Sequence, residues 1–270
     1  MTLSLLVNQG VDVNSILHEI ILNKRHEVEL LKQKLVLDET PRISKKSFKS
    51  SLLNRGLAVI AEVKRKSPAK GLLSIIADPV ELACSYQRGG ACAISVLTDE
   101  CYFGGSIKDL KKIAVALKNT NVTILCKDFI IDPIQIREAV FEGADAVLLI
   151  ASVLKDKLKP LLDCAKKMNV DVLVEVHDQQ DVCLALNAGA EIIGVNNRDL
   201  NTFDVDINRS LQLIKCIPQH IVRVSESGLS SPKTTQELYQ AGFDAVLVGA
   251  SLVCSEDPGE LIKKMRGQNE

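Results

Sequence analysis

The chain has 270 residues, of which 46% are hydrophobic and 25% are charged, a composition typical of a folded globular protein rather than a disordered one. Its 33 Lys and Arg balance 34 Asp and Glu, and this net charge of −1 disfavours a nucleic-acid-binding function, which needs an excess of basic side chains. No apolar run approaches the ~20 residues of a membrane-spanning helix, and the first residues lack a secretory signal pattern, so we expect a cytoplasmic protein without membrane partners.

Residues 1–56, before the first predicted strand, carry apolar side chains at helical spacing between Val13 and Leu35. This stripe predicts one or two amphipathic helices. The polar link at residues 38–50 follows it, and we expect that link to be a solvated connector.

Eight short apolar runs of β-strand character follow, starting near residues 57, 91, 122, 145, 171, 191, 220 and 244. The spacing leaves room for one helix between successive runs, which predicts parallel strands joined by helices. Runs that are apolar throughout indicate strands buried on both faces. We therefore predict a single α/β domain, a (β/α)8 TIM barrel at residues 57–270. The helical extension at 1–56 is expected on its bottom or flank, with a substrate-covering or partner-binding role as the alternative.

A Gly-Ala or Gly-Phe step precedes every second run, at Gly90, Gly143, Gly189 and Gly242. Each glycine is expected to end a helix in the left-handed conformation. A feature on alternate strands fits a closed eight-stranded barrel, although an open doubly wound sheet is also compatible with it. The first strand-to-helix turn lacks GxGxxG, so nothing favours a dinucleotide-binding domain.

Charged and amide side chains stand where the predicted strands end, and TIM barrels assemble their active sites at that end. Burying so many charges is costly unless they pair with one another or with a ligand. Balanced acids and bases at the same end of the barrel predict acid–base chemistry on an anionic substrate. For any single residue, the alternative is an ion pair that only closes the end of the barrel. The residues are Glu62, Lys64, Lys127, Glu175, Asn196, Arg198 and Glu226.

Two glycine-containing turns follow the last two strands, at Ser227-Gly228 and Gly249-Ala250. Barrels commonly bind phosphate at these two places through backbone N–H groups, and Lys64 is available as a counter-charge. Simple strand-ending turns are the alternative.

Further side chains near the strand ends are candidates for a binding wall. The segment from Ser67 to Gly71 contains Pro and Gly, which predicts a loop and a candidate hinged lid. Phe103 lies in a glycine-rich turn, and Phe129 and Leu148 could add apolar surface, although each of these alone is more often a core residue.

Eight successive strand-end motifs resemble those of the indole-3-glycerol phosphate synthase family: AEVKRKSPAKG, SVLTDECYFGGS, LCKDFIID, GADAVLLI, LVEVH, GVNNRDL, VSESGL and VLVGASLV. They occur in the family's order between residues 61 and 253, and SILHEIILNKRHEV resembles its leading helix. The resemblance implies a carboxy-lyase of tryptophan biosynthesis. This enzyme converts 1-(2-carboxyphenylamino)-1-deoxyribulose 5-phosphate into indole-3-glycerol phosphate, carbon dioxide and water, with no cofactor or metal.

The resemblance also implies roles for individual residues. Lys127 is the general acid for the developing alkoxide, with a pKa expected to be depressed by its neighbours; Glu175 handles a later proton transfer, and Lys64 stabilises charge or serves as an alternative acid. The implied positioning residues are Glu62, Asn196 and Glu226. The anthranilate side would be oriented by Ser67 and Arg198, and the aromatic pocket would be lined by Phe103, Phe129 and Leu148. The phosphate would be held by Ser227, Gly228, Gly249 and Ala250.

Two positions depart from the family pattern. Ala250 stands where some members have Ser, which removes one hydroxyl contact to phosphate, and His177 stands where some have Asn, which leaves its role open. The alternatives to a synthase are another phosphosugar barrel such as phosphoribosylanthranilate isomerase, and a non-catalytic barrel that binds a phosphorylated ligand. We expect a monomer, with a dimer as the alternative.

The eight cysteines form no CxxC pair and have no neighbouring His cluster, so the sequence predicts neither a metal site nor disulfides. We expect reduced thiols that pack as small hydrophobic side chains.

Overall fold

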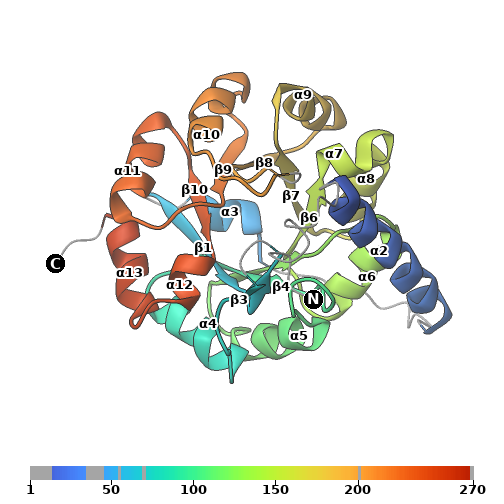
Figure 1. The fold of residues 1–270 in the computed structure, drawn as a ribbon, viewed down its shortest axis with the longest axis horizontal. Coiled ribbons are helices and arrows are strands. Elements are labelled where there is room, and N and C mark those ends of the chain that lie inside the picture. The colour runs from blue at the N-terminus through green and yellow to red at the C-terminus, as the bar shows by residue number, and fades with distance from the viewer. Residues whose placement is uncertain (1–13, 35–45, 54–55, 69–70, 200–201, 268–270) are drawn as a thin grey trace.

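Eight parallel strands close into one barrel at the centre of the molecule (Figure 1). The structure is a computed structural model, and it describes residues 14–34, 46–53, 56–68, 71–199 and 202–267. Each strand pairs with the next along the chain, and the last pairs back onto the first through Ala58 and Ala245. The strands are β1 (Ala58–Val63), β4 (Ala93–Leu97), β5 (Thr123–Lys127), β6 (Ala146–Ile150), β7 (Asp171–Val176), β8 (Ile192–Asn196), β9 (Val222–Glu226) and β10 (Ala245–Val248). The predicted TIM barrel is confirmed.

Helices alternate with the strands and surround the barrel (Figure 1). The four glycines expected to be left-handed have positive φ angles of 89° at Gly90, 104° at Gly143, 87° at Gly189 and 104° at Gly242, as predicted. The outer helices are α4 (Pro79–Arg88), α5 (Ile107–Ala116), α6 (Pro133–Phe141), α8 (Leu158–Lys167), α9 (Gln179–Ala188), α10 (Asn208–Leu213), α11 (Pro232–Ala241) and α13 (Pro258–Met265). Shorter turns are α7 (Ala151–Leu154), η1 (Lys155–Lys157), η2 (Ile214–Cys216) and α12 (Ala250–Val253).

A short helix, α3 (Phe48–Leu52), closes the N-terminal end of the barrel. Phe48 is fully buried among the barrel's inward-facing side chains, and Lys46 Nζ donates to the carbonyls of Leu117 and Val122, both at 2.9 Å. The expectation of a solvated connector is therefore wrong for Phe48, which fills the barrel end, and for Lys46, which binds carbonyl oxygens, whereas Ser47 and Ser50 are exposed as expected. Residues 38–45 lie outside the described residues.

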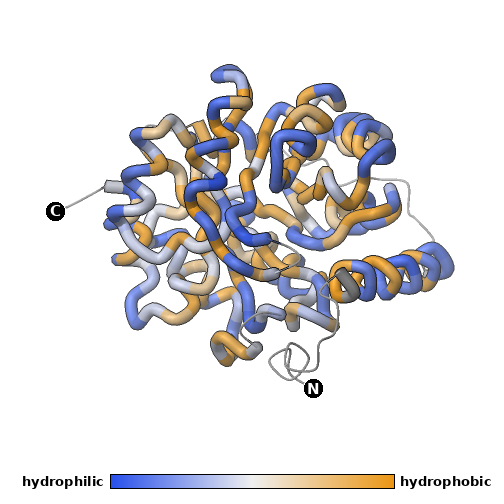
Figure 2. The backbone as a smooth tube through the Cα atoms, turned by 45° about the horizontal axis from the view of Figure 1, so that its top comes forward, coloured by the Kyte–Doolittle hydropathy of each residue, from blue (hydrophilic) through white to orange (hydrophobic). Residues whose placement is uncertain are grey.

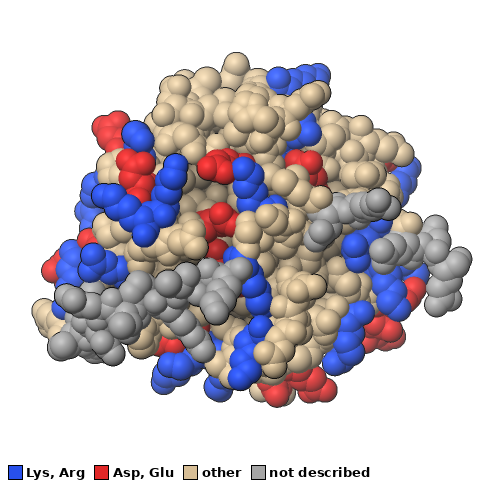
Figure 3. All heavy atoms as spheres, turned by 180° about the vertical axis from the view of Figure 1, so that it is seen from behind, with Lys and Arg blue, Asp and Glu red and all other residues tan. Residues whose placement is uncertain are grey.

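Figure 3 shows the face opposite to that of Figure 1, where acidic and basic side chains are interspersed.

In the leading segment, the described residues 14–34 form the helix α2 (Asn14–Lys34), which packs beside α6 (Figure 1). Hydrophobic and hydrophilic stretches alternate along it (Figure 2). Lys24, only 2% exposed, forms ion pairs with Asp99 at 3.0 Å and Asp128 at 2.8 Å, in the loops after β4 and β5. Of the two expected positions, the flank is correct in that α2 packs beside α6, and the barrel bottom is wrong, because the two carboxylates hold α2 at the end of the barrel where the strands terminate.

Directly after β1, a small antiparallel hairpin joins β2 (Lys66–Ser67) to β3 (Gly71–Leu72) at the same end. The segment from Ser67 to Gly71 was expected to be a loop, and its ends are paired; residues 69 and 70 lie outside the described residues. None of the described helices combines the length and the apolar character needed to cross a membrane.

Candidate active site

A cavity of about 110 Å³ lies where the barrel strands end. Its walls come from segments far apart in the sequence, because the barrel gathers the C-terminal ends of all its strands into one ring. Most of the candidate residues line it: Lys64, Ser67, Phe103, Lys127, Phe129, Leu148, Glu175, Asn196, Arg198, Ser227 and Ala250. The other four candidates, Glu62, Glu226, Gly228 and Gly249, belong to the strand ends and turns beside it.

Several apolar residues of the cavity wall are not among the site residues predicted from the sequence. Ile16, Leu17 and Ile20 of α2 line the cavity, together with Phe203 from the loop after β8. The apolar stripe of α2 is visible in the sequence, but the stripe itself does not say which surface it meets. The further lining residues are Pro68, Leu73, Leu97, Asp128 and Ile150.

Lys127 and Glu175 form the centre of the charged cluster. Lys127 Nζ lies 3.7 Å from Glu175 Oε2, beyond hydrogen-bond distance but close enough for strong attraction in a buried site. Burial lowers the pKa of Lys127, but the carboxylates of Glu175, Glu62 and Glu226 outweigh burial, so the pKa is raised overall. The expectation of a depressed pKa is wrong, because three carboxyl groups surround this ammonium.

Glu175 is held as a carboxylate. Burial raises its pKa, but attraction to Lys127 and hydrogen bonding to His177 and Asn196 outweigh burial and lower the pKa to about 2. Asn196 Nδ2 donates to Glu175 Oε1 at 3.0 Å. At neutral pH this group is therefore an acceptor of protons and hydrogen bonds.

A second ion pair joins Glu62 to Lys64, two residues apart on β1 and just after it. Burial raises the pKa of Glu62, whereas Lys64 and Lys127 lower it more strongly, so this carboxyl group is also ionised. The side chain of Lys64 is 20% exposed and lines the cavity. The pair therefore presents a cation to a ligand and keeps its counter-ion beneath.

Glu226 differs from the other two carboxyl groups. Burial, followed by repulsion from Glu175, raises the pKa of Glu226 to about 8, so it carries a proton at neutral pH. A side chain at Gly194 on the neighbouring strand would overlap this carboxyl group, so the glycine makes room for it. Two ionised acids and one neutral acid thus face the lysines.

Asn196 connects the acids to the loop after β8. Its Oδ1 accepts the backbone N–H of Arg198 at 3.0 Å, and Arg198 Nη1 donates to the carbonyl of Phe203 at 2.7 Å. Burial lowers the pKa of Arg198, but a guanidinium stays charged in proteins. Arg198 thus adds a positive charge to the cavity wall.

The two glycine turns lie side by side at the cavity edge. Ser251 Oγ donates to the carbonyl of Leu229 at 2.7 Å, which ties the turn after β10 to the turn after β9. Ser227 has a positive φ of 68°, and a side chain at Gly249 would overlap the Glu62 carboxylate. The backbone therefore approaches the Glu62–Lys64 pair more closely than any other residue type allows.

The opposite part of the wall is aromatic. The rings of Phe103 and Phe129 lie with centroids 6.0 Å apart at an angle of 38°, and Leu148 lines the cavity with them. Tilted rings at this distance attract one another and offer a flat apolar surface. The cavity is thus charged in the middle and apolar on one side.

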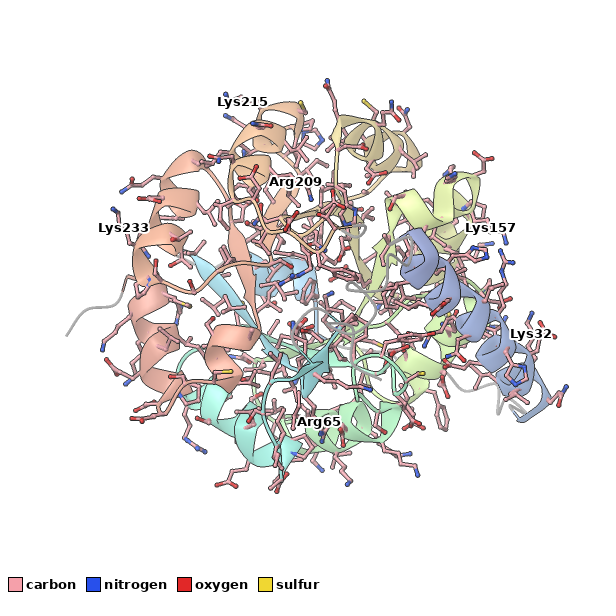
Figure 4. The ribbon with its side chains drawn as sticks, viewed as in Figure 1. Lys32, Arg65, Lys157, Arg209, Lys215 and Lys233 are labelled. Atoms are coloured by element: carbon pink, nitrogen blue, oxygen red, sulfur yellow. The ribbon has the colours of Figure 1, made fainter. Side chains whose placement is uncertain are left out.

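Two arginine ion pairs at the barrel mouth each join the first turn of a helix, α5 or α10, to a strand-end loop, and the two arginines lie on opposite sides of the mouth (Figure 4). Arg65 pairs with Asp109 at 2.6 Å, and Arg209 pairs with Asp199 at 3.3 Å.

A larger cavity of about 340 Å³ lies under α2, and neither Lys127 nor Glu175 lines it. Within the described part of the chain, no group of three or more His, Cys, Asp or Glu side chains is placed to hold a metal ion.

Comparison with known proteins identifies this arrangement. A family model described as indole-3-glycerol phosphate synthase matches residues 17–265, which include every candidate site residue. The chain belongs to the indole-3-glycerol phosphate synthase family. Members of this family are decarboxylating lyases of tryptophan biosynthesis that act on a phosphorylated small molecule, so the predicted family and enzyme class are confirmed.

Curated members of the family match most of the chain. An indole-3-glycerol phosphate synthase from Caldanaerobacter subterraneus is 44% identical over 260 residues, covering 93% of this chain and 99% of its own. One from Bacteroides thetaiotaomicron is 41% identical, covering 93% and 97%. One from Kineococcus radiotolerans is 48% identical, covering 76% and 74%.

Solved structures support the fold. The 3-hexulose-6-phosphate synthase from Salmonella typhimurium matches with a TM-score of 0.63 and 18% identity, covering 78% of this chain and 97% of its own. Thiamine phosphate pyrophosphorylase from Pyrococcus furiosus matches with a TM-score of 0.61 and 15% identity, covering 82% and 96%. At such low identity, these likenesses show a shared barrel and nothing about the reaction.

Proposed function

We propose that this chain is an indole-3-glycerol phosphate synthase. It closes the indole ring of 1-(2-carboxyphenylamino)-1-deoxyribulose 5-phosphate and releases carbon dioxide and water. The observation that carries the proposal is the cavity itself. It places the cations Lys64 and Lys127 and the carboxylate Glu175 between an aromatic wall and two glycine turns.

The substrate has three parts that match three regions of the site. Its phosphate binds at the turns containing Ser227, Gly228, Gly249 and Ala250, where backbone N–H groups can donate to it. Its aromatic ring stacks against Phe103 and Phe129, beside Leu148. Its carbonyl then lies in the middle, within reach of Lys127.

Ring closure is the first step. A carbon of the aromatic ring attacks the ketose carbonyl, and the carbonyl oxygen becomes an alkoxide that takes a proton from the Lys127 ammonium. The raised pKa of Lys127 keeps this group charged until the alkoxide, a much stronger base, develops beside it. Lys64 stabilises the same negative charge.

Decarboxylation and dehydration complete the reaction. The carboxylate leaves as carbon dioxide, and its bonding electrons remain in the ring. The new hydroxyl group then leaves as water with a proton from Lys64, which solvent replaces, while the ionised Glu175 accepts a proton from the carbon framework. Because Glu175 Oε2 lies 3.7 Å from Lys127 Nζ, it can return that proton to Lys127 for the next turnover.

Other residues position these groups. The ionised Glu62 and the protonated Glu226 position the lysines, Asn196 holds Glu175, and Ser67 and Arg198 orient the anthranilate side. Since these groups all come from one chain, the site supports a monomeric enzyme. The extension at 1–56 and the barrel at 57–270 work as one unit, because α2 supplies part of the cavity wall.

The test is a fluorescence assay with the carboxyphenylamino substrate. The product's indole ring fluoresces, and because the chain has no Trp its own background is small. Lys127→Ala should lower kcat by at least about a hundredfold, the scale expected for a positioned general acid. Folded wild-type protein that gives no indole signal would rule out the proposed function, and near-normal turnover by Lys127→Ala would rule out the role of Lys127.

A further inference from the structure

A buried histidine beside the cavity has no part in the reaction just described. His177 follows β7 directly, and its side chain is 13% exposed. Its Nε2 lies 3.3 Å from Glu175 Oε1, and its Nδ1 lies 3.5 Å from Asp181 Oδ2. The imidazole thus stands between a carboxylate that lines the cavity and a carboxylate at the start of α9.

Asp181 is itself firmly placed. It lies in the first turn of α9 and is 7% exposed. Its Oδ2 accepts the backbone N–H of His177 at 3.0 Å, while its own backbone N–H donates to the N-cap residue Asp178 at 2.8 Å. The same carboxylate therefore faces both the main chain and the ring of His177, which fixes the direction of that ring.

The two oxygens of Glu175 have different surroundings. Oε1 receives the Asn196 amide at 3.0 Å and lies 3.3 Å from His177, whereas Oε2 is directed at Lys127. A carboxylate with one free torsion could otherwise exchange its oxygens. With the Asn196 amide bonded to Oε1 and the His177 ring beside the same oxygen, the oxygen that faces Lys127 and the substrate is Oε2.

We propose that His177 is a positioning residue: held by Asp181, it fixes the Glu175 carboxylate so that Oε2 faces Lys127 and the substrate. The inference rests on the proposed function, because His177 acts through a group assigned to proton transfer. Among the described residues, His177 is not part of the cavity lining, so it has no direct contact with substrate there.

The charges around the ring agree with this role. Burial lowers the pKa of His177, but hydrogen bonding and attraction to Asp181 and Glu175 outweigh burial and raise it to about 9. Across the barrel, Lys127 on β5, Glu62 on β1 and Glu226 on β9 also act on this cluster. His177 is therefore an imidazolium at neutral pH, with a protonated ring nitrogen beside each of the two carboxylates.

The first experiment titrates the imidazoles of the full-length protein by NMR. The chain has four histidines, so His177→Asn assigns the signal of His177. We expect His177 to remain protonated up to a pKa of about 9. A signal that titrates near the ordinary value of 6.5 would overturn the inference, and this measurement needs no enzyme activity.

The second experiment measures kcat and KM across pH for His177→Asn and Asp181→Asn. Misplacing a reacting group by a fraction of an ångström to an ångström costs up to about a hundredfold in rate, so we expect His177→Asn to lower kcat at least about tenfold with KM within about twofold. Without the imidazolium, the pKa of Glu175 rises, so the acidic limb of the kcat profile moves to higher pH. In Asp181→Asn the pKa of His177 falls, so the alkaline limb moves to lower pH.

His220→Asn is the matched control, because His220 is exposed and stands before β9 at the other end of the barrel. If His177→Asn shows the same kcat and pH profile as this control, the inference is wrong while the proposed function stands. If wild-type protein has no synthase activity, the proposed function is wrong. Should His177→Asn fail to fold, His18→Asn, His26→Asn and His220→Asn assign the His177 signal by elimination, and the NMR titration of Asp181→Asn decides: an unchanged His177 pKa refutes the inference.

Discussion

Replacing Lys24 by Met tests what holds α2 on the barrel. Lys24 is 2% exposed and faces three carboxylates, of which Glu27 is 41% exposed and can be hydrated after the change. Asp99 cannot, with a side-chain exposure of 0%, whereas Asp128 is 14% exposed, lines the cavity and keeps hydrogen bonds from Thr98 Oγ1 and the Phe129 backbone N–H. Asp99 keeps the backbone N–H groups of Tyr102 and Phe103 on its Oδ1, but its Oδ2 loses the cation.

Removing one partner of a buried ion pair costs about 3–5 kcal/mol, and the hydrogen bonds that remain favour the lower end. A loss of about 3 kcal/mol corresponds to a fall in Tm of roughly 6–12 °C for a domain of this size. If the protein instead releases α2 to expose the carboxylates, the loss is smaller. The cavity then lacks Ile16, Leu17 and Ile20, and KM rises.

The assay combines urea unfolding, thermal melting and steady-state kinetics at neutral pH. Lys32→Met is the matched control, because Lys32 lies on the same helix, is 43% exposed and pairs with Glu29 and Asp132 at the surface (Figure 4). Exposed pairs contribute little, so this control should keep nearly all of its stability and its KM. If Lys24→Met changes stability and KM no more than Lys32→Met does, the Lys24 ion pairs do not anchor α2.

Three other variants test the site. Glu226 holds its proton up to about pH 8 in the folded protein but only up to about pH 4.5 in the unfolded chain, so the free energy of unfolding of the wild type should fall as the pH rises through this range. Glu226→Gln should make this fall shallower in urea unfolding measured at several pH values. An unchanged dependence of the unfolding free energy on pH contradicts this. Phe103→Leu removes the ring contact with Phe129 and should raise KM about fivefold at similar kcat. Gly249→Ala forces the Glu62 carboxylate to move and should lower kcat at least about tenfold, while circular dichroism shows an intact fold.

Much of the fold was predictable because a parallel barrel buries each strand on both faces, which leaves uninterrupted apolar runs such as Ala146–Ile150. The candidate site followed from topology. Once eight strands form a ring, polar residues at their ends, such as Lys127 and Glu175, must face one another across it. Their roles stay predictions until the variants are measured.

Other features depend on contacts that local patterns do not encode. The position of α2 is set by Lys24 meeting Asp99 and Asp128, which lie far along the chain. Whether the pKa of Lys127 is raised or lowered depends on how many carboxyl groups surround its ammonium, and the sequence does not show which residues are neighbours in space. Phe48 stands within a polar stretch of sequence, and nothing in that stretch indicates that its ring packs into the N-terminal end of the barrel.

The docking of α2 has a consequence for the order in which the protein is made. Lys24 leaves the ribosome before Asp128, so this helix waits for about a hundred residues of later synthesis before its partners exist. Until β4 and β5 have been made and paired, its apolar stripe has no surface to cover. Of the described helices, the one translated first therefore forms its final contacts late, and the cavity acquires its last wall only after that.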